Sequence, residues 1–252
     1  MGWLSALIIL ISTLVTSAIS GVFGMAGGLM LMGVLAFILP VQSALALHGV
    51  VQISSNGWRM LLHRVHVQWR IVAFFAIGAF AAMGLFAVAS FTPTKALVYF
   101  ALGLLPGLVW IPERWFKLDA AQPGQAMICG LLSTGLSLTA GVSGPFTDLF
   151  FINTQISRHQ VVATKACMQA FGHLSKIVAY GAALFSVQGQ REVPWQLLAG
   201  AVGLSMVGIV VGGWILDRMS DEGFRLWRRW IVTIMGAVYL VQAVMLILNG
   251  AT

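Results

Sequence analysis

The segments Gly24-Met25-Ala26-Gly27-Gly28 and Gly141-Val142-Ser143-Gly144-Pro145 each interrupt a long apolar run. The first interruption follows apolar residues 4–22 and the second follows residues 126–140, and apolar residues resume after both. Glycine adopts backbone angles that other residues avoid, and it allows another group to approach closely. The two segments therefore predict two broken helices, one in each half of the chain.

An offset of 117 residues superimposes the two interruptions and also four polar residues that follow them. It pairs His48 with Lys165, Gln52 with Gln169, Asn56 with His173 and Arg59 with Lys176. We therefore predict two homologous four-segment repeats with glycine-broken first segments. Repeat 1 covers residues 1–111, a connecting loop covers 112–125, and repeat 2 covers 126–252.

The composition predicts an all-α multi-pass membrane protein. Hydrophobic residues make up 59% of the 252 residues, charged residues 8%, and the mean hydropathy is +0.93. Soluble domains carry about 25% charged residues, which excludes an ordinary soluble protein. The net charge of +7 comes mostly from Lys and Arg in short loops beside apolar runs, a pattern that sets membrane orientation. The expected partner is a lipid bilayer and not nucleic acid.

Two topologies remain open for the eight apolar segments. Besides the two broken segments, they are expected over 43–62, 71–91, 96–110, 160–185, 195–216 and 230–248. Basic residues gather after the second segment and again before the last, and placing both clusters in the cytoplasm requires an even number of crossings between them. That condition favours re-entrant broken segments and an inverted repeat. The alternative is a direct repeat of eight plain crossings.

The interruptions predict an anion site. Irregular backbone at membrane depth persists only where it is buried in protein or lines a polar cavity. A half-helix that starts there presents free N–H groups and a partial positive charge, and paired broken helices indicate a transport site. The alternative is a packing kink. The backbone candidates for the site are Gly24, Gly27, Gly28, Gly141, Ser143 and Gly144.

The paired polar residues lie on one helical face in each half, since they are spaced four, four and three apart. A charged side chain at the bilayer centre costs roughly 3 kcal/mol, so these groups need a polar partner or water. The side-chain candidates for anion binding are Lys165, His48, Gln52, Gln169, Asn56 and His173. Hydrogen bonding between helices is the alternative for the histidine and glutamine side chains. Arg59 and Lys176 either line the site or extend to the membrane surface.

Asp148 is the only acidic residue inside an apolar run, and it follows the second interruption closely. Two roles remain open for it. It forms a structural ion pair with Lys165, or it carries a proton that is coupled to anion movement.

The sequence also excludes several classes of function. It contains no Ser-His-Asp set, no paired carboxylates and no phosphate-binding loop, so we do not expect an enzyme. Cys129 and Cys167 lie in apolar runs and no Cys/His spacing indicates zinc, so we expect neither a metal nor a cofactor. A secondary transporter for a small anion remains, with its site at the repeat interface. A gated anion channel and a membrane subunit of an enzyme complex are alternatives, and the oligomeric state stays open.

The duplicated order of short motifs resembles the TauE/SafE sulfite exporter family, also called TSUP or DUF81. The first copy comprises residues 20–28, Pro40 and His66-Val67-Gln68-Trp69, and the second comprises residues 140–146, Ser157, Lys165 and Glu192-Val193-Pro194-Trp195. The resemblance implies transport of sulfite, thiosulfate or organosulfonates across the bacterial inner membrane. Ala26 and Pro145 stand where the family commonly has glycine.

Overall fold

The computed structural model describes residues 2–112, 115, 117–184 and 193–250, and within these residues the fold is entirely helical. This confirms the predicted all-α class. The helices are α1 (Trp3–Phe23), α2 (Met25–Ile38), α3 (Val41–Leu62), α4 (Trp69–Ala89), α5 (Lys95–Leu104), α6 (Pro123–Ala140), α7 (Gly144–Leu149), α8 (Arg158–Tyr180), α9 (Trp195–Leu216) and α10 (Asp221–Leu248). Short 3-10 turns follow α3, α5 and α8.

Four of the described helices contain a stretch long and apolar enough to cross a membrane. These are α1, α4, α9 and the part of α10 from Trp230 to Leu248. Their outer faces expose large apolar side chains such as Phe80 and Val88, which is 87% exposed. A soluble protein rarely leaves such surface uncovered. The chain is therefore a multi-pass membrane protein, as its composition predicts.

Several helix boundaries differ from the expected ones, and two of the differences have a clear cause. The helix α10 begins at Asp221, ahead of the apolar run that starts at residue 230, because polar residues outside the membrane can continue a helix. The helix α6 begins at Pro123 and so takes over the end of the predicted connecting loop. Proline fits the first turn of a helix, where its missing N–H needs no partner.

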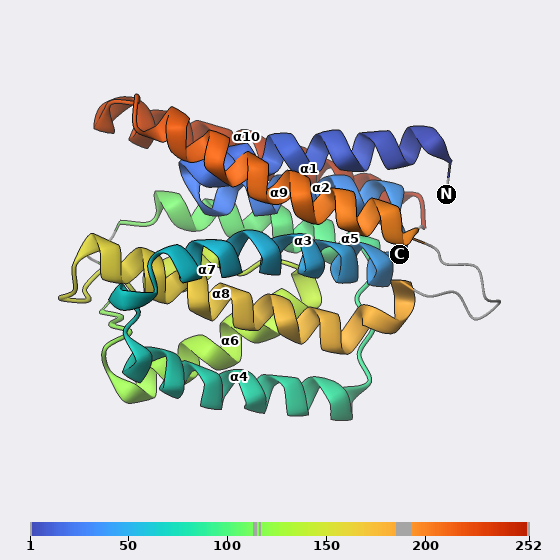
Figure 1. Cartoon of the computed structure of the whole chain (residues 1–252). Helices are drawn as coiled ribbons and strands as arrows, with labels where there is room; N and C mark the ends of the chain where they lie inside the picture. Colours follow the sequence, from blue (N-terminus) through green and yellow to red (C-terminus); the bar gives the residue numbers. More distant parts are fainter. Residues whose placement is uncertain (1, 113–114, 116, 185–192, 251–252) are drawn as a thin grey trace.

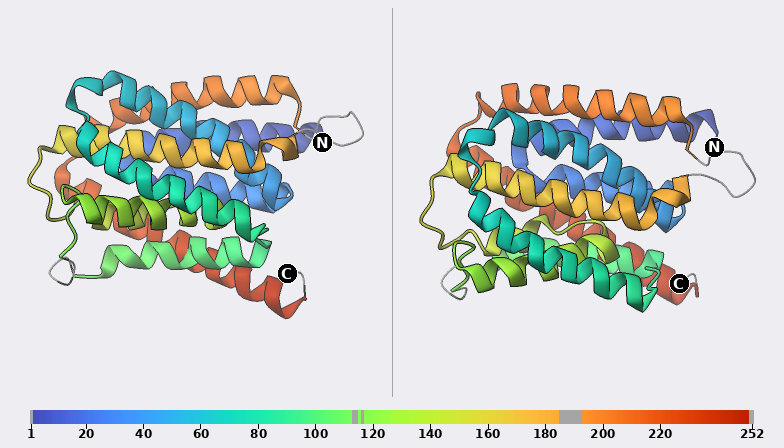
Figure 2. Two further views of the ribbon diagram at one scale, coloured as in Figure 1. Left: turned by 90° about the horizontal axis from the view of Figure 1, so that it is seen from below. Right: turned by 60° about the horizontal axis from the view of Figure 1, so that its bottom comes forward.

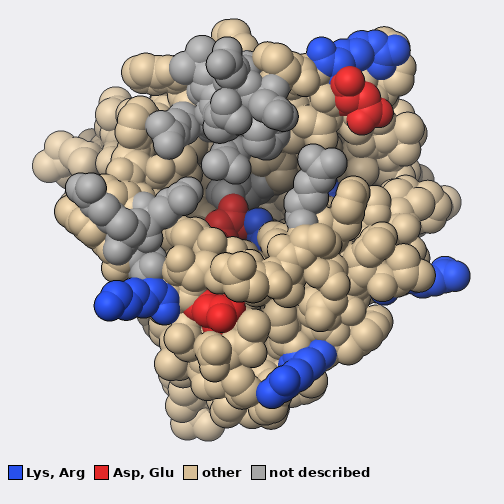
Figure 3. Space-filling view, turned by 90° about the vertical axis from the view of Figure 1, so that its left-hand side faces the viewer, with Lys and Arg blue, Asp and Glu red and all other residues tan. Residues whose placement is uncertain are grey.

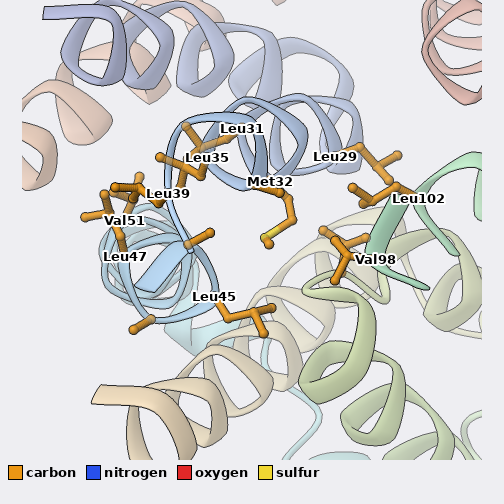
Figure 4. Packing of buried hydrophobic residues seen from close by; sticks show 14 of the residues in the cluster. Leu29, Leu31, Met32, Leu35, Leu39, Leu45, Leu47, Val51, Val98 and Leu102 are labelled. Carbon is orange, nitrogen blue, oxygen red and sulfur yellow. The ribbon is translucent and has the colours of Figure 1, made fainter. Parts of the chain in front are cut away.

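The two helices that carry the polar residues, α3 and α8, lie in the middle of the molecule. Figure 1 shows them between a layer that contains α1, α9 and α10 and a layer that contains α4 and α6. The helix α3 packs against α2, and apolar side chains of both helices belong to the core. Met32 and Leu35 of α2 lie near Leu45 and Leu47 of α3 (Figure 4). The outer helices thus cover α3 and α8 from two opposite sides (Figure 1), while α8 keeps apolar side chains such as Val178 exposed.

Close approach of small residues joins the first helix of one half to the third apolar helix of the other. The helix α1 packs on α9, where a Cβ added at Gly21 would lie 2.8 Å from the Cα of Gly212. Likewise α6 packs on α4, where a Cβ on Gly130 would lie 2.0 Å from the carbonyl oxygen of Phe75. Glycine at such contacts lets two membrane helices approach closely and gain dispersion energy.

The helix α3 packs against α8, and α5 packs against α10, in opposite directions. At one end of the α3–α8 pair, Ser43 Oγ donates to the carbonyl of Ala183 at 3.1 Å. At the other end, the rings of His66 and His159 lie 5.5 Å apart. The two helices therefore run antiparallel, and Figure 2 shows them side by side in both views. The pair α5 and α10 is also antiparallel, since Tyr99 contacts Tyr239 while Trp110 contacts Trp230.

Candidate functional site

Each of the two interruptions contains a glycine with a positive φ angle. Gly24, between α1 and α2, has φ +70°, and Gly141, at the end of α6, has φ +81°. Residues with a Cβ rarely adopt this conformation, so glycine is required at both places. The helix after the first interruption, α2, is long, whereas α7 after the second has only six residues. The expected pair of half-helices is therefore unequal.

A polar cavity lies where the two interruptions meet α3 and α8. Its volume is about 30 Å³, which is comparable to the volume that one water molecule occupies in the liquid. It is lined by Ser20, Gly24, Gly28, His48, Gln52, Asn56, Ser137, Val142, Ser143, Gly144, Pro145, Gln169 and His173. Most of the candidates chosen from the sequence are thus brought together from four helices and both halves of the chain.

A chain of hydrogen bonds connects the two interruptions through the wall of this cavity. Lys176 is fully buried, and its Nζ donates to the carbonyl of Gly141 at 2.7 Å. The same Nζ lies 2.5 Å from His48 Nδ1, and His48 Nε2 lies 2.9 Å from the carbonyl of Gly28. Since a carbonyl only accepts, the proton of the His48 ring is on Nε2 and Nδ1 accepts from Lys176.

The histidine and amide side chains of the cavity differ in how many of their polar atoms have a hydrogen-bond partner. Ser55 Oγ donates to Gln52 Oε1 at 3.0 Å, and Gln52 Nε2 lies 3.4 Å from His48 Nε2. Asn56 donates to the carbonyl of Gln52 at 3.0 Å. The ring of His173 lies 5.6 Å from that of His48, and its buried Nδ1 has no hydrogen-bond partner among the described residues. An incoming oxyanion could bind at that nitrogen.

Lys165 and Asp148 lie outside the lining of the cavity. They form an ion pair with each other, and their side chains are 22% and 26% exposed. Gly27 is also outside, because it packs on α1, where an added Cβ would lie 1.9 Å from the carbonyl oxygen of Thr16. Gly141 contributes its carbonyl to Lys176 and does not line the cavity itself.

Sequence reasoning missed Lys176 as a central group, because it left open that this side chain extends to the membrane surface. The complete burial of Lys176 rules that alternative out. Its position three residues after His173, on the face shared by the paired polar residues, was the available signal. Ser20, Ser137 and Val142 also line the cavity without having been chosen.

A larger hollow, which we call the vestibule, lies beside the cavity at the end of α3. Its volume is about 470 Å³, and it is lined by Gly21, Trp58, Arg59, Leu62, His63, Val162, Ile209, Val210, Gly213, Trp214, Leu216 and Asp217. Figure 3 views this end of the molecule, where most of the Lys and Arg side chains lie apart from one another toward the edges of the view. Arg59 Nη2 donates to the carbonyl of Ser20, a residue of the cavity lining, at 3.0 Å. Arg59 therefore stands between the vestibule and the cavity.

Comparison with known proteins identifies the family. The comparison with curated proteins gave no match, and the comparison with solved structures gave none either. The family described as "Sulfite exporter TauE/SafE" matches residues 8–239, which is most of the chain. This match confirms the family resemblance and the expectation that the protein is not an enzyme. The chain belongs to the sulfite exporter TauE/SafE family of membrane transporters.

Proposed function

We propose that the protein is a secondary transporter that moves a small sulfur-containing or organic anion across the bacterial inner membrane. Sulfite, thiosulfate and organosulfonates are the substrates to test. The observation that carries the proposal is the cavity between the two interruptions, where His48 and His173 meet Gln52 and Gln169. Imidazole and amide N–H groups are suitable donors for sulfonate or sulfite oxygens, and the surrounding helices exclude water, which strengthens such bonds.

We further propose that residues 1–111 and 126–252 are two inverted repeats joined by 112–125. Two observations support this. If the two halves are interchanged, α1 takes the place of α6 and α9 takes the place of α4. The contact of α1 with α9 then becomes the contact of α6 with α4. The helices in matching positions, α3 with α8 and α5 with α10, run antiparallel. Inverted repeats of this kind permit alternating access around a central site.

In this proposal the anion binds after the two halves have moved apart. A volume of about 30 Å³ leaves room for little more than a water molecule, whereas sulfite has four heavy atoms. The conformation described here is then a closed one. Opening on the vestibule side would connect the cavity to the Arg59 end of the molecule, where the basic side chain attracts anions.

Binding and flux of thiosulfate test the proposal. Purified protein should bind thiosulfate saturably, and protein in liposomes should exchange labelled thiosulfate for unlabelled thiosulfate on the other side. Replacing Gln169, which lines the cavity, with leucine should weaken both. The matched control is Gln196→Leu on the exposed side of α9, which should change neither. Electrical currents far above transporter turnover would favour the gated anion channel, and no binding of any sulfur oxyanion would refute the proposed substrate class.

A further inference from the structure

Lys176 is a buried basic group that has no acidic partner in the part of the chain that the structure describes. Its side chain is fully buried near the C-terminal end of α8. Among the residues that the structure describes, the one acid in an apolar run, Asp148, is paired with Lys165 instead, and no carboxylate contacts Lys176. A charge that is buried away from water without a counter-charge is strongly disfavoured. A protonated Lys176 would therefore need a negative charge that the described residues do not supply.

The hydrogen bonds of Lys176 fit an uncharged amine. A neutral amine has two N–H groups, whereas the ammonium has three. Lys176 Nζ has two acceptors, the carbonyl of Gly141 and His48 Nδ1. Both N–H groups of the neutral amine are thus satisfied, and a third proton finds no acceptor among the described contacts.

The groups that face Lys176 can exchange a proton with the cavity. His48 on α3 is bonded to Lys176 and lines the cavity, and His173 on α8 lies beside both with its Nδ1 unpaired. From the other elements, α6 presents the carbonyl of Gly141 and α2 presents that of Gly28, and neither titrates. The remaining charged neighbours lie further off, with Arg59 bonded at Ser20 and the Lys165–Asp148 pair outside the cavity.

We propose that Lys176, His48 and His173 form one proton-binding unit, and that this unit takes up a proton when an anion enters the cavity. This inference rests on the proposed transport function and names its coupling ion. The proton comes from the solution on the side where the anion binds, and both leave together on the other side. The anion supplies the missing counter-charge, and the proton supplies the N–H that binds the anion. A monovalent anion then crosses with no net charge, and a divalent one crosses with one negative charge.

Calorimetry of the purified full-length protein measures the proton directly. Thiosulfate and methanesulfonate are the probes, because both stay ionised near neutral pH, whereas sulfite itself takes up a proton there. Titrations in Tris and in imidazole give the number of protons bound per anion from the difference in buffer heat. Sulfonate and phosphate buffers are avoided because their anions would compete. We expect uptake of about one proton per anion, and a Kd that rises about tenfold per pH unit wherever the free unit is unprotonated.

Two variants test whether the proton binds at the proton-binding unit or at the Lys165–Asp148 pair. Lys176→Met keeps an unbranched apolar side chain and removes the proton acceptor, and we expect proton uptake to be lost. The control replaces the ion pair with Lys165→Met and Asp148→Asn together, and we expect its proton uptake to equal that of wild type. If Lys176→Met does not fold, the wild-type proton number and the double variant decide the question without it.

The other outcomes contradict either the proton-binding unit or the proposed substrate class. Saturable binding without proton uptake in wild type overturns the proton-binding unit but leaves the transporter. Unchanged uptake in folded Lys176→Met, or lost uptake in the double variant, assigns the proton elsewhere and also overturns it. If neither probe binds to folded wild-type protein, the proposed substrate class fails and the inference fails with it.

Discussion

Replacing Gly28 with alanine places one methyl group in the wall of the cavity. A Cβ at this position would lie 2.6 Å from Gln52 Nε2 and 3.9 Å from His48 Nε2. The amide of Gln52 is the end of a flexible side chain, so it can rotate away, while the bond from His48 to the Gly28 carbonyl remains possible. Alanine favours a helix by up to about 1 kcal/mol over glycine. We therefore expect Gly28→Ala to fold with a stability within about 1 kcal/mol of wild type.

The same substitution should weaken anion binding strongly. The methyl group takes space from a cavity of only about 30 Å³ and turns the amide of Gln52 away from it. A hydrogen bond to a charged group contributes about 1.5–3 kcal/mol. Loss of one such bond corresponds to an affinity that is about 10- to 150-fold lower.

Titration calorimetry with thiosulfate and thermal unfolding measure the two effects, and two further glycines calibrate them. An added Cβ at Gly84 on α4 meets no atom within 4 Å, so Gly84→Ala should leave thiosulfate affinity unchanged and raise stability by the helix preference of alanine alone, up to about 1 kcal/mol. At Gly27 it would lie 1.9 Å from the carbonyl oxygen of Thr16, so Gly27→Ala should lower the unfolding temperature. Wild-type thiosulfate affinity in well-folded Gly28→Ala would refute the assignment of this cavity as the binding site.

Three further predictions concern the interruptions, the ion pair and the vestibule. Gly24→Ala and Gly141→Ala should each lower the unfolding temperature, since both glycines have a positive φ angle that residues with a Cβ rarely adopt. An unchanged unfolding temperature in circular-dichroism melts would contradict this. Lys165→Ala alone should lower the stability of the protein more than Lys165→Ala together with Asp148→Ala, because the single change leaves a partly buried carboxylate unpaired. A tenfold loss of thiosulfate affinity at unchanged stability would instead make Lys165 an anion ligand. Arg59→Gln should slow initial thiosulfate flux most at low salt, and a loss independent of salt would exclude a role in attraction.

The parts of the site that the sequence predicts are those set by local chemistry. Glycines that interrupt an apolar run at membrane depth indicate a buried or polar environment, which led to Gly24 and Gly28. The same argument also led to Gly27 and Gly141, which lie outside the lining. The spacing of His48, Gln52 and Asn56 fixes them to one helical face whatever surrounds that helix. These three residues line the cavity, as do Gly24 and Gly28.

The depth of a basic side chain cannot be predicted in the same way. Lys165 sits inside the apolar run of residues 161–168, which made it the stronger candidate. In the structure α3 and the end of α6 cover Lys176 completely, while Lys165 faces Asp148 at a partly open position. Burial depends on which neighbouring helices pack over a residue, and those helices are distant in sequence. The hydropathy of the residue's own segment does not contain that information.

The bond between Lys176 and His48 constrains how the two halves can move. Each partner also bonds a backbone carbonyl of its own half, Lys176 that of Gly141 and His48 that of Gly28. If the halves rock about the cavity, this cross-half contact either stays closed as a pivot or opens and leaves two buried polar atoms without partners. Leaving buried polar groups unpaired is costly, so an empty, uncharged unit holds the halves together. A proton and an anion arriving together supply replacement partners for both atoms, which lowers the cost of opening. The contact that closes the empty site would thus also make its opening depend on substrate, and a transporter with that property would not leak protons when no anion is bound.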